Sequence, residues 1–202
     1  MSEYDVPTEA AHILSLIEAK VPDAKLLKRL DVIQWLLADT SFLVAQKHKY
    51  ELLALERTWG IHLLRTIRPE STTESNWGEV GEEIVRELLL VEGQTATKPT
   101  VLAEKYELDW ETTTHMIEAK SQGHHMTGTA DEKIFGVPFK YADVPDLYKK
   151  PVLVVLVGGA EVKARNRQLL DPIKESKKRH VAFWLAEGFS FIGGSQILRR
   201  LK

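Results

Sequence analysis

The stretch that decides the fold is Pro151-Val152-Leu153-Val154-Val155-Leu156-Val157, a continuous aliphatic run that ends at Gly158-Gly159. Such a run is typical of a central strand that is buried on both faces, because neither face then carries polar side chains. A central strand needs further strands beside it and helices over its faces. The sequence on either side should therefore contain both.

Three more strands are expected around this run. Thr100 to Trp110 and His115 to Ser121 have the composition of strands, and the polar stretch 111–114 between them is typical of a turn, so the two should form a hairpin. Phe189-Ser190-Phe191-Ile192 is predicted to be a last strand. Together with the aliphatic run, these segments predict a mixed sheet.

Helices should flank this sheet. Residues Trp77 to Glu92 predict an amphipathic helix that Gly93 ends. Its apolar side is formed by Val80, Ile84, Leu88 and Val91. A basic helix is expected over about Lys174 to Ala186, before the last strand.

Residues 130–148 are expected to mix short helices with turns. Pro138 and Pro145 should limit the length of any helix there, because proline removes a backbone donor and crowds the preceding turn. The segment Phe135 to Tyr141 mixes aromatic residues with Lys140, which suits either an approach to nucleic acid or packing onto the sheet, and for Phe135 and Phe139 we expect packing onto the sheet.

The chain divides into two regions. From about Thr8 to Arg68, apolar residues recur at three- and four-residue steps, which predicts helices, and residues 69–76 are polar and typical of a loop. We therefore expect a helical subdomain over residues 1–70, suited to dimerisation or DNA contact, and a catalytic core over residues 77–202. The predicted fold class is α/β (α+β mixed), with a mixed central sheet flanked by helices.

Composition limits the function classes. The chain has 202 residues, of which 44% are hydrophobic, and no cysteine, which excludes disulfides and thiolate metal sites and fits a reducing, cytoplasmic location. It has no run of about 18 apolar residues, so no membrane span is expected. The net charge is −2, whereas proteins that bind nucleic acid without sequence preference are usually basic. Any DNA binding must then depend on local positive charge and on contacts that read sequence.

The second strand of the predicted hairpin carries an acid-x-Lys tripeptide, Glu118-Ala119-Lys120. Such tripeptides also start at Glu18, Asp23, Asp131, Glu161 and Glu175. The tripeptide is therefore weak evidence alone, and its setting distinguishes it. It lies on a strand, and a further acid, Asp109, precedes it across the turn.

This arrangement suits a divalent metal and an activated water. Side chains alternate along a strand, so Glu118 and Lys120 share one face, and the turn brings Asp109 near Glu118. Two carboxylates can hold Mg²⁺, which prefers oxygen ligands. The metal would polarise a phosphodiester and lower the pKa of a water. Lys120 would orient that water or offset charge on the phosphate.

Two alternatives stay open at this point. Glu107 and Glu104 are rival first acids in place of Asp109. Polar residues are also common on strands near a sheet edge, and Glu118 with Lys120 would then form only an exposed salt-linked pair.

A longer pattern supports the metal site. It comprises Leu108-Asp109-Trp110, Ile117-Glu118-Ala119-Lys120-Ser121-Gln122 and Gly128-Thr129-Ala130-Asp131-Glu132-Lys133-Ile134. An acid, a Glu-x-Lys strand and a Gly-Thr-x-x-Glu-Lys segment in this order resemble the PD-(D/E)xK nuclease superfamily, in particular type II restriction endonucleases. The resemblance covers about Trp77 to Val157. Leu108 stands where the motif has proline, a frequent substitution in the family.

The resemblance implies roles for the residues that match the motif. It implies that Asp109 and Glu118 bind Mg²⁺ and that the carbonyl of Ala119 completes the metal shell. It also implies that Lys120 is the catalytic lysine and that the core has a restriction-endonuclease-like fold.

The resemblance also points to residues outside the central motif. The preceding helix often supplies a further acid, and Glu82 is the first candidate and Glu79 the second, although Glu82 suits an ordinary solvent-facing position equally well. Gln122 and Lys133 are candidates for holding substrate or bracing the site, or for structural hydrogen bonds.

The expected function is therefore that of a Mg²⁺-dependent, sequence-specific endodeoxyribonuclease that hydrolyses phosphodiester bonds of double-stranded DNA. Symmetric cleavage of both strands would require a homodimer. A DNA nickase, a junction-resolving enzyme or a homing nuclease is the alternative among nucleases. A non-catalytic nucleic-acid-binding protein is the alternative from another class.

Overall fold

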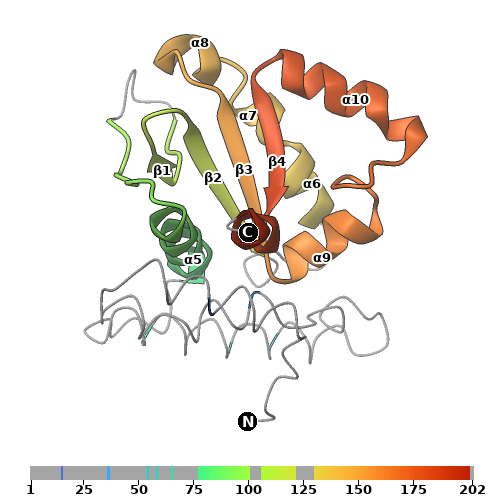
Figure 1. Ribbon diagram of the computed structural model, residues 1–202. Helices are drawn as coiled ribbons and strands as arrows, with labels where there is room; N and C mark the ends of the chain where they lie inside the picture. The colour runs from blue at the N-terminus through green and yellow to red at the C-terminus, as the bar shows by residue number, and fades with distance from the viewer. Residues whose placement is uncertain are drawn as a thin grey trace.

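The computed structural model describes residues 77–100, 106–121 and 130–200, together with the single positions Ser15, Leu36, Ala54, Thr58 and Arg65. These ranges hold a four-stranded sheet in the order β1-β2-β3-β4 (Figure 1). The strands are β1 (Trp110–Glu111), β2 (Met116–Ser121), β3 (Val152–Val157) and β4 (Phe189–Gly193). Because β1 is antiparallel to β2 while β2, β3 and β4 run parallel, the expected mixed sheet is confirmed.

Strand β3 lies between β2 and β4, as the aliphatic run predicts. All of its side chains are buried except that of Leu153, which is half-buried. The two outer predictions also hold, since β2 begins one residue after His115 and β4 begins at Phe189. The local pattern thus located the three parallel strands.

The first strand of the hairpin is much shorter than expected. Only Trp110–Glu111 pairs with β2, and residues 106–109 are not in a strand, so the prediction of a strand from Thr100 is wrong over that part. On its outer edge, within the described ranges, β1 pairs at Glu111, which bridges to Thr97. A two-residue strand suffices because the turn is closed by Thr112, whose hydroxyl accepts a hydrogen bond from the N–H of His115 at 3.0 Å.

Helices cover both faces of the sheet (Figure 1). They are α5 (Trp77–Val91), α6 (Ala130–Phe135), α7 (Val137–Lys140), α8 (Val144–Tyr148), α9 (Gly159–Asn166), α10 (Glu175–Ala186) and α11 (Gly194–Arg199). Helices α5 and α11 pack on one face, while α6, α7 and α9 contribute to the core cluster on the other, with alternate residues of β3. Helix α10 lies beside β4.

Helix α5 confirms the amphipathic prediction. The predicted residues Val80, Ile84, Leu88 and Val91 are all buried, and Val85 and Leu89 are buried with them. Gly93 follows the helix with φ +82°, a left-handed conformation that glycine adopts readily. The basic helix is confirmed as α10, and α9 begins at Gly159, in the glycine pair that ends β3, whereas α11 was not expected as a helix of its own.

The region between β2 and β3 confirms the expected short helices and turns but corrects the expectation for Phe139. Pro138 and Pro145 lie in the first turns of α7 and α8, so they begin these helices, because proline has the backbone angle of a first turn and needs no partner there. Phe135 packs against the core, as expected, but Phe139 is 92% exposed. Helix α7 turns Val137 inward, and a residue two positions later then faces outward.

Much of the predicted helical subdomain, residues 1–70, lies outside the described residues, and the division into two regions stays a prediction. In ranges 77–100, 106–121 and 130–200, each helix is too short or too polar to cross a bilayer.

A buried acid on α9, Glu161, links this helix to α11 by hydrogen bonds. Glu161 is buried and accepts hydrogen bonds from Arg165 at 2.6 Å and from the N–H of Ser195 at 3.0 Å. The Ser195 hydroxyl also contacts its Oε1 atom. Gly193 leaves the space for this carboxylate, because a Cβ atom there would lie 2.3 Å from Glu161 Oε1.

Gly193→Ala should therefore lower the free energy of unfolding by about 2 kcal/mol, the usual cost of overpacking a filled interior. Urea denaturation measures this loss. In a Glu161→Ala background the carboxylate is gone, so the added cost of Gly193→Ala should shrink. Equal costs in the two backgrounds would show that the glycine is not required by this carboxylate.

Candidate active site

Glu118 and Lys120 form a buried ion pair on β2. Both side chains point to the face covered by α6 and α7, which confirms the shared face expected from strand alternation. The Lys120 amino group contacts Glu118 Oε1 and also lies 3.1 Å from the carbonyl oxygen of Ala119. The two side chains are 15% and 5% exposed, so the alternative of an exposed salt-linked pair does not describe them.

The hairpin brings Asp109 to the same place. Trp110 pairs with Ile117, and the next step of this antiparallel register sets Asp109 opposite Glu118. The Asp109 N–H donates to the carbonyl of Ile117 at 3.1 Å, and its carboxylate accepts a hydrogen bond from the N–H of Ala119 at 2.6 Å. The short strand β1 therefore suffices to place the two acids side by side.

The two carboxylates carry more negative charge than their surroundings offset. Burial is the main cause that raises the pKa of Asp109 to about 7, and the charge of Glu118 adds to it. The hydrogen bond from Ala119 and the charge of Lys120 lower the pKa of Asp109, but by less. A further cation beside the pair would stabilise both ionised acids.

One carboxylate oxygen is suited to such a cation. Glu118 Oε2 is buried and has no hydrogen-bond partner among the residues that the structure describes, an unfavourable state for a carboxylate away from water. Asp109 and Glu118 together offer hard oxygen ligands, and Mg²⁺ commonly takes one or two protein carboxylates and completes its shell with water and substrate phosphate. The residues present thus fit Mg²⁺, although the described ranges hold no group of three or more His, Cys, Asp or Glu side chains that would form a denser metal site.

The other predicted acids lie around this pair. Glu82 on α5 adds to the raised pKa of Asp109, but its carboxylate is 2.7 Å from the amino group of Lys98. Glu107 has an exposed side chain, and Glu79 lies in the first turn of α5. Glu104 and Gln122 fall outside the described residues. Asp109 is therefore the first acid that the fold brings to Glu118.

Sequence reasoning missed Tyr141, at the end of α7. Its buried hydroxyl lies 3.3 Å from Glu118 Oε1 and 3.0 Å from the carbonyl oxygen of Glu107, and it accepts a hydrogen bond from Lys140 at 2.7 Å. Burial, then the charges of Glu118 and Asp109, raise the pKa of Tyr141, so the hydroxyl keeps its proton. No local spacing pointed to this residue.

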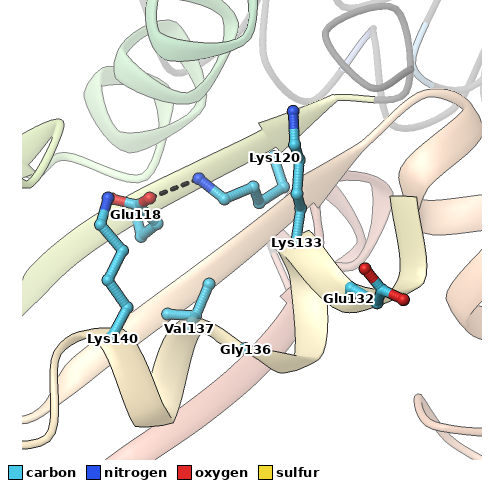
Figure 2. A pocket seen from close by; sticks show the side chains of 7 residues that line it. All are labelled: Glu118, Lys120, Glu132, Lys133, Gly136, Val137 and Lys140. Carbon is cyan, nitrogen blue, oxygen red and sulfur yellow. Dashed lines mark hydrogen bonds and ion pairs between the residues drawn. The ribbon is translucent and has the colours of Figure 1, made fainter. Parts of the chain in front are cut away.

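A cavity of about 330 Å³ opens beside Glu118 (Figure 2). Three lysines line it, Lys120 from β2, Lys133 from α6 and Lys140 from α7. Figure 2 shows the side chains of Lys120 and Lys140 reaching toward Glu118, while Glu132 points away. Lys133, a predicted candidate for holding substrate, thus lies at the site. The cavity combines a buried acid with a cationic wall, which suits a phosphate group.

A second cavity, of about 300 Å³, lies on the Asp109 side and is lined by Glu82, Lys98 and Glu107 as well as Asp109. Glu118 therefore lines the first cavity and Asp109 the second, and the linings of the two cavities differ in charge. The lysine-lined opening is the one that attracts an anion.

Comparison of the chain with protein-family models, with curated proteins and with solved structures finds no match.

Asp109→Asn should stabilise the protein more at pH 8 than at pH 5. With its pKa of about 7, the folded carboxyl is protonated at pH 5 and ionised at pH 8, whereas in the unfolded chain, with a pKa of 3.8, it is ionised at both. The native protein therefore loses stability as the pH rises through 7, and asparagine removes this loss. The stabilisation should grow by about 2 kcal/mol between the two pH values, measured by urea unfolding in EDTA.

Glu107→Gln is the matched control, because the side chain of Glu107 is exposed. It should change the free energy of unfolding little at either pH. A stabilisation by Asp109→Asn that is the same at pH 5 and pH 8 would contradict the coupling between the buried acids.

Proposed function

We propose that this protein is a Mg²⁺-dependent endodeoxyribonuclease that hydrolyses phosphodiester bonds of double-stranded DNA, with a restriction-endonuclease-like core. One observation carries the proposal. Glu118 lines a cavity with a lysine wall, its Oε1 atom contacts Lys120, and its buried Oε2 atom has no hydrogen-bond partner among the described residues, while Asp109 is held on the neighbouring strand by the N–H of Ala119. Metal-assisted hydrolysis of a phosphodiester uses carboxylate ligands for the metal ion, a lysine and a cavity that accepts the phosphate group.

The charges of the cavity support a phosphate substrate. The lining includes three lysines, Lys120, Lys133 and Lys140, and two acids, Glu118 and Glu132, so it has an excess of positive charge. The amino groups belong to three different elements, which lets them approach one phosphate from several sides. Positive charge is therefore local, as a DNA-binding chain with net charge −2 requires.

Four residues of the site have a role in the proposed reaction. Bound Mg²⁺ would polarise the phosphodiester and lower the pKa of an attacking water. Asp109 and Glu118 supply the oxygen ligands that hold it. Lys120 stabilises the negative charge that develops on the phosphate in the transition state. Tyr141 keeps its proton and so orients the Glu118 carboxylate by a hydrogen bond.

The order of elements also supports the resemblance to the PD-(D/E)xK superfamily. An antiparallel hairpin carries Asp109 and Glu118, and helix α6 begins at Ala130, inside the segment Gly128–Ile134 that matches the family pattern. Strand β3 then returns parallel to β2.

Sequence-specific cleavage by a homodimer is the finer form of this proposal, since two active sites related by two-fold symmetry cut both strands of one site. Residues 1–70 are the region we propose for subunit contact. A nickase, junction-resolving or homing activity would use the same site. Cleavage of a long mapped DNA distinguishes these forms, since discrete bands indicate a fixed recognition sequence.

Lys120→Ala should lower Mg²⁺-dependent plasmid cleavage by at least about 100-fold, because it removes charge stabilisation in the transition state. Folding and DNA binding should survive, and circular dichroism and gel shift in EDTA check them. The chain supplies a matched control in its second Glu-Ala-Lys tripeptide, since Lys20→Ala removes the same side chain from the same local sequence.

Unchanged cleavage by Lys120→Ala would overturn the proposed mechanism. DNA binding without cleavage by the native protein, under any divalent metal, would instead support a non-catalytic DNA-binding protein.

The first acid can be tested in the same assay. Asp109→Ala should abolish cleavage, because it removes a metal ligand, whereas Glu107→Ala should retain most activity. The reverse order would assign the metal to Glu107. Isothermal titration with Mg²⁺ should show the same difference between the variants in the absence of DNA.

A further inference from the structure

Helices α7 and α10 each carry an exposed aromatic side chain that the proposed reaction does not use. Phe139 is 92% exposed, and Phe183 on α10 is 61% exposed. Together with Phe135, Pro138 and Trp184 they line a cavity of about 270 Å³ between these helices. Large aromatic rings in this position gain little from the core and leave flat apolar faces available to a ligand.

A basic cavity continues from this aromatic one. It has a volume of about 320 Å³, and it shares Phe135 and Trp184 with the first cavity. The rings of these two residues are parallel within 3°, with centroids 6.1 Å apart. The remaining wall includes Arg167, Lys177 and His180. The two cavities therefore adjoin at Phe135 and Trp184, and we call them together the α7–α10 groove, with an aromatic end and a basic end.

Helix α10 packs against the core through Trp184 and otherwise presents its side chains to the groove and to solvent. None of its residues is buried in the part of the chain that the structure describes. Its first half is basic, with Lys177, Lys178 and Arg179, and its second half carries Phe183. The polar and apolar halves follow one another along the helix, so a bound chain would meet cations first and then aromatic rings.

The groove borders the proposed active site. Gly136, Val137 and Lys140 line the cavity beside Glu118, whereas Pro138 and Phe139 of the same short helix line the groove. Helix α7 thus separates the two cavities by its own width. A ligand in the groove that continued past α7 would reach the lysine-lined cavity.

We infer that the α7–α10 groove binds an unpaired stretch of the DNA strand, with bases stacked on Phe139 and Phe183 and phosphates beside Lys177 and Arg167. Aromatic platforms beside a cationic track are the combination that binds single-stranded nucleic acid, because every base has a stacking face and every nucleotide a phosphate. The choice of DNA rests on the proposed function. The preferred substrate would then carry a flap or junction next to the cut.

Binding of fluorescein-labelled oligo(dT) by the full-length chain, followed by anisotropy in EDTA, tests the groove without cleavage. The double variant Phe139→Ala/Phe183→Ala should bind about 10-fold more weakly or worse, because it removes two stacking faces. Both side chains are exposed, so the fold should persist. Leu185→Ala is the matched control, since Leu185 is 65% exposed on the same helix but is not among the residues that line the groove.

The basic end has its own test. Lys177→Ala/His180→Ala should weaken oligo(dT) binding and reduce its dependence on salt concentration, because fewer counterions are released. All these groove variants should bind a blunt duplex of equal length with the same affinity as the native chain. Equal losses for duplex and oligo(dT) would overturn the single-strand assignment.

Three further outcomes would also overturn the inference. These are unchanged oligo(dT) binding by the Phe139→Ala/Phe183→Ala variant, tighter binding of oligo(rU) than of oligo(dT), and displacement of oligo(dT) by polyglutamate as readily as by unlabelled oligo(dT). The last would identify a site for acidic peptides or for polyanions in general.

A cleavage assay separates this inference from the proposed function. In Mg²⁺ the native protein should cut a flapped duplex faster than a blunt one, and the Phe139→Ala/Phe183→Ala variant should lose that ratio while it still cuts the blunt duplex. Lys120→Ala should bind oligo(dT) normally. Failure of the groove alone leaves cleavage intact, and failure of the nuclease proposal alone leaves oligo(dT) binding intact.

Discussion

The burial of the Glu118 carboxylate between β2 and α7 is the constraint on which the arrangement of this face depends. A buried charge costs several kcal/mol unless it is paired, and Lys120 and Tyr141 provide only part of the compensation. Tyr141 reaches Glu118 only if α7 lies against the sheet, with Val137 in the core. The same placement builds the lysine-lined cavity on the inner side of α7 and turns Phe139 outward. The packing of α7 over this buried acid thus determines the core position of Val137, the lysine-lined cavity and the exposure of Phe139.

The elements that the sequence predicted are those whose own residues determine them. Strand β3 is apolar on both faces, and α5 has an apolar side, so each pattern is complete within the segment. Helix α11 escaped prediction because it depends on a distant residue, since Glu161 holds the N–H of Ser195 and requires Gly193 beside it. The length of β1 likewise depends on its neighbours, because among the described residues Glu111 alone has a partner on the outer edge.

The same distinction applies to the candidate site. Strand alternation predicts the shared face of Glu118 and Lys120, and a short turn brings Asp109 to them. Tyr141 lies 23 positions after Glu118, and its approach depends on how α7 packs, which no local pattern specifies. Phe139 shows the converse error. Its apolar character suggested the core, but Pro138 begins a helix whose inward positions are already set by Val137 and Tyr141.

The state of Asp109 connects stability with function. A carboxyl whose pKa is about 7 is half protonated at neutral pH, so the pair with Glu118 lowers its repulsion by holding a proton when no cation is present. A cation held by oxygen ligands requires that proton to leave, so metal affinity and pH are linked at this site. An apolar pair at these positions would fold more favourably, but it would hold no cation. The Oε2 atom of Glu118, which has no hydrogen-bond partner among the described residues, is consistent with a site that is complete only when a cation is bound.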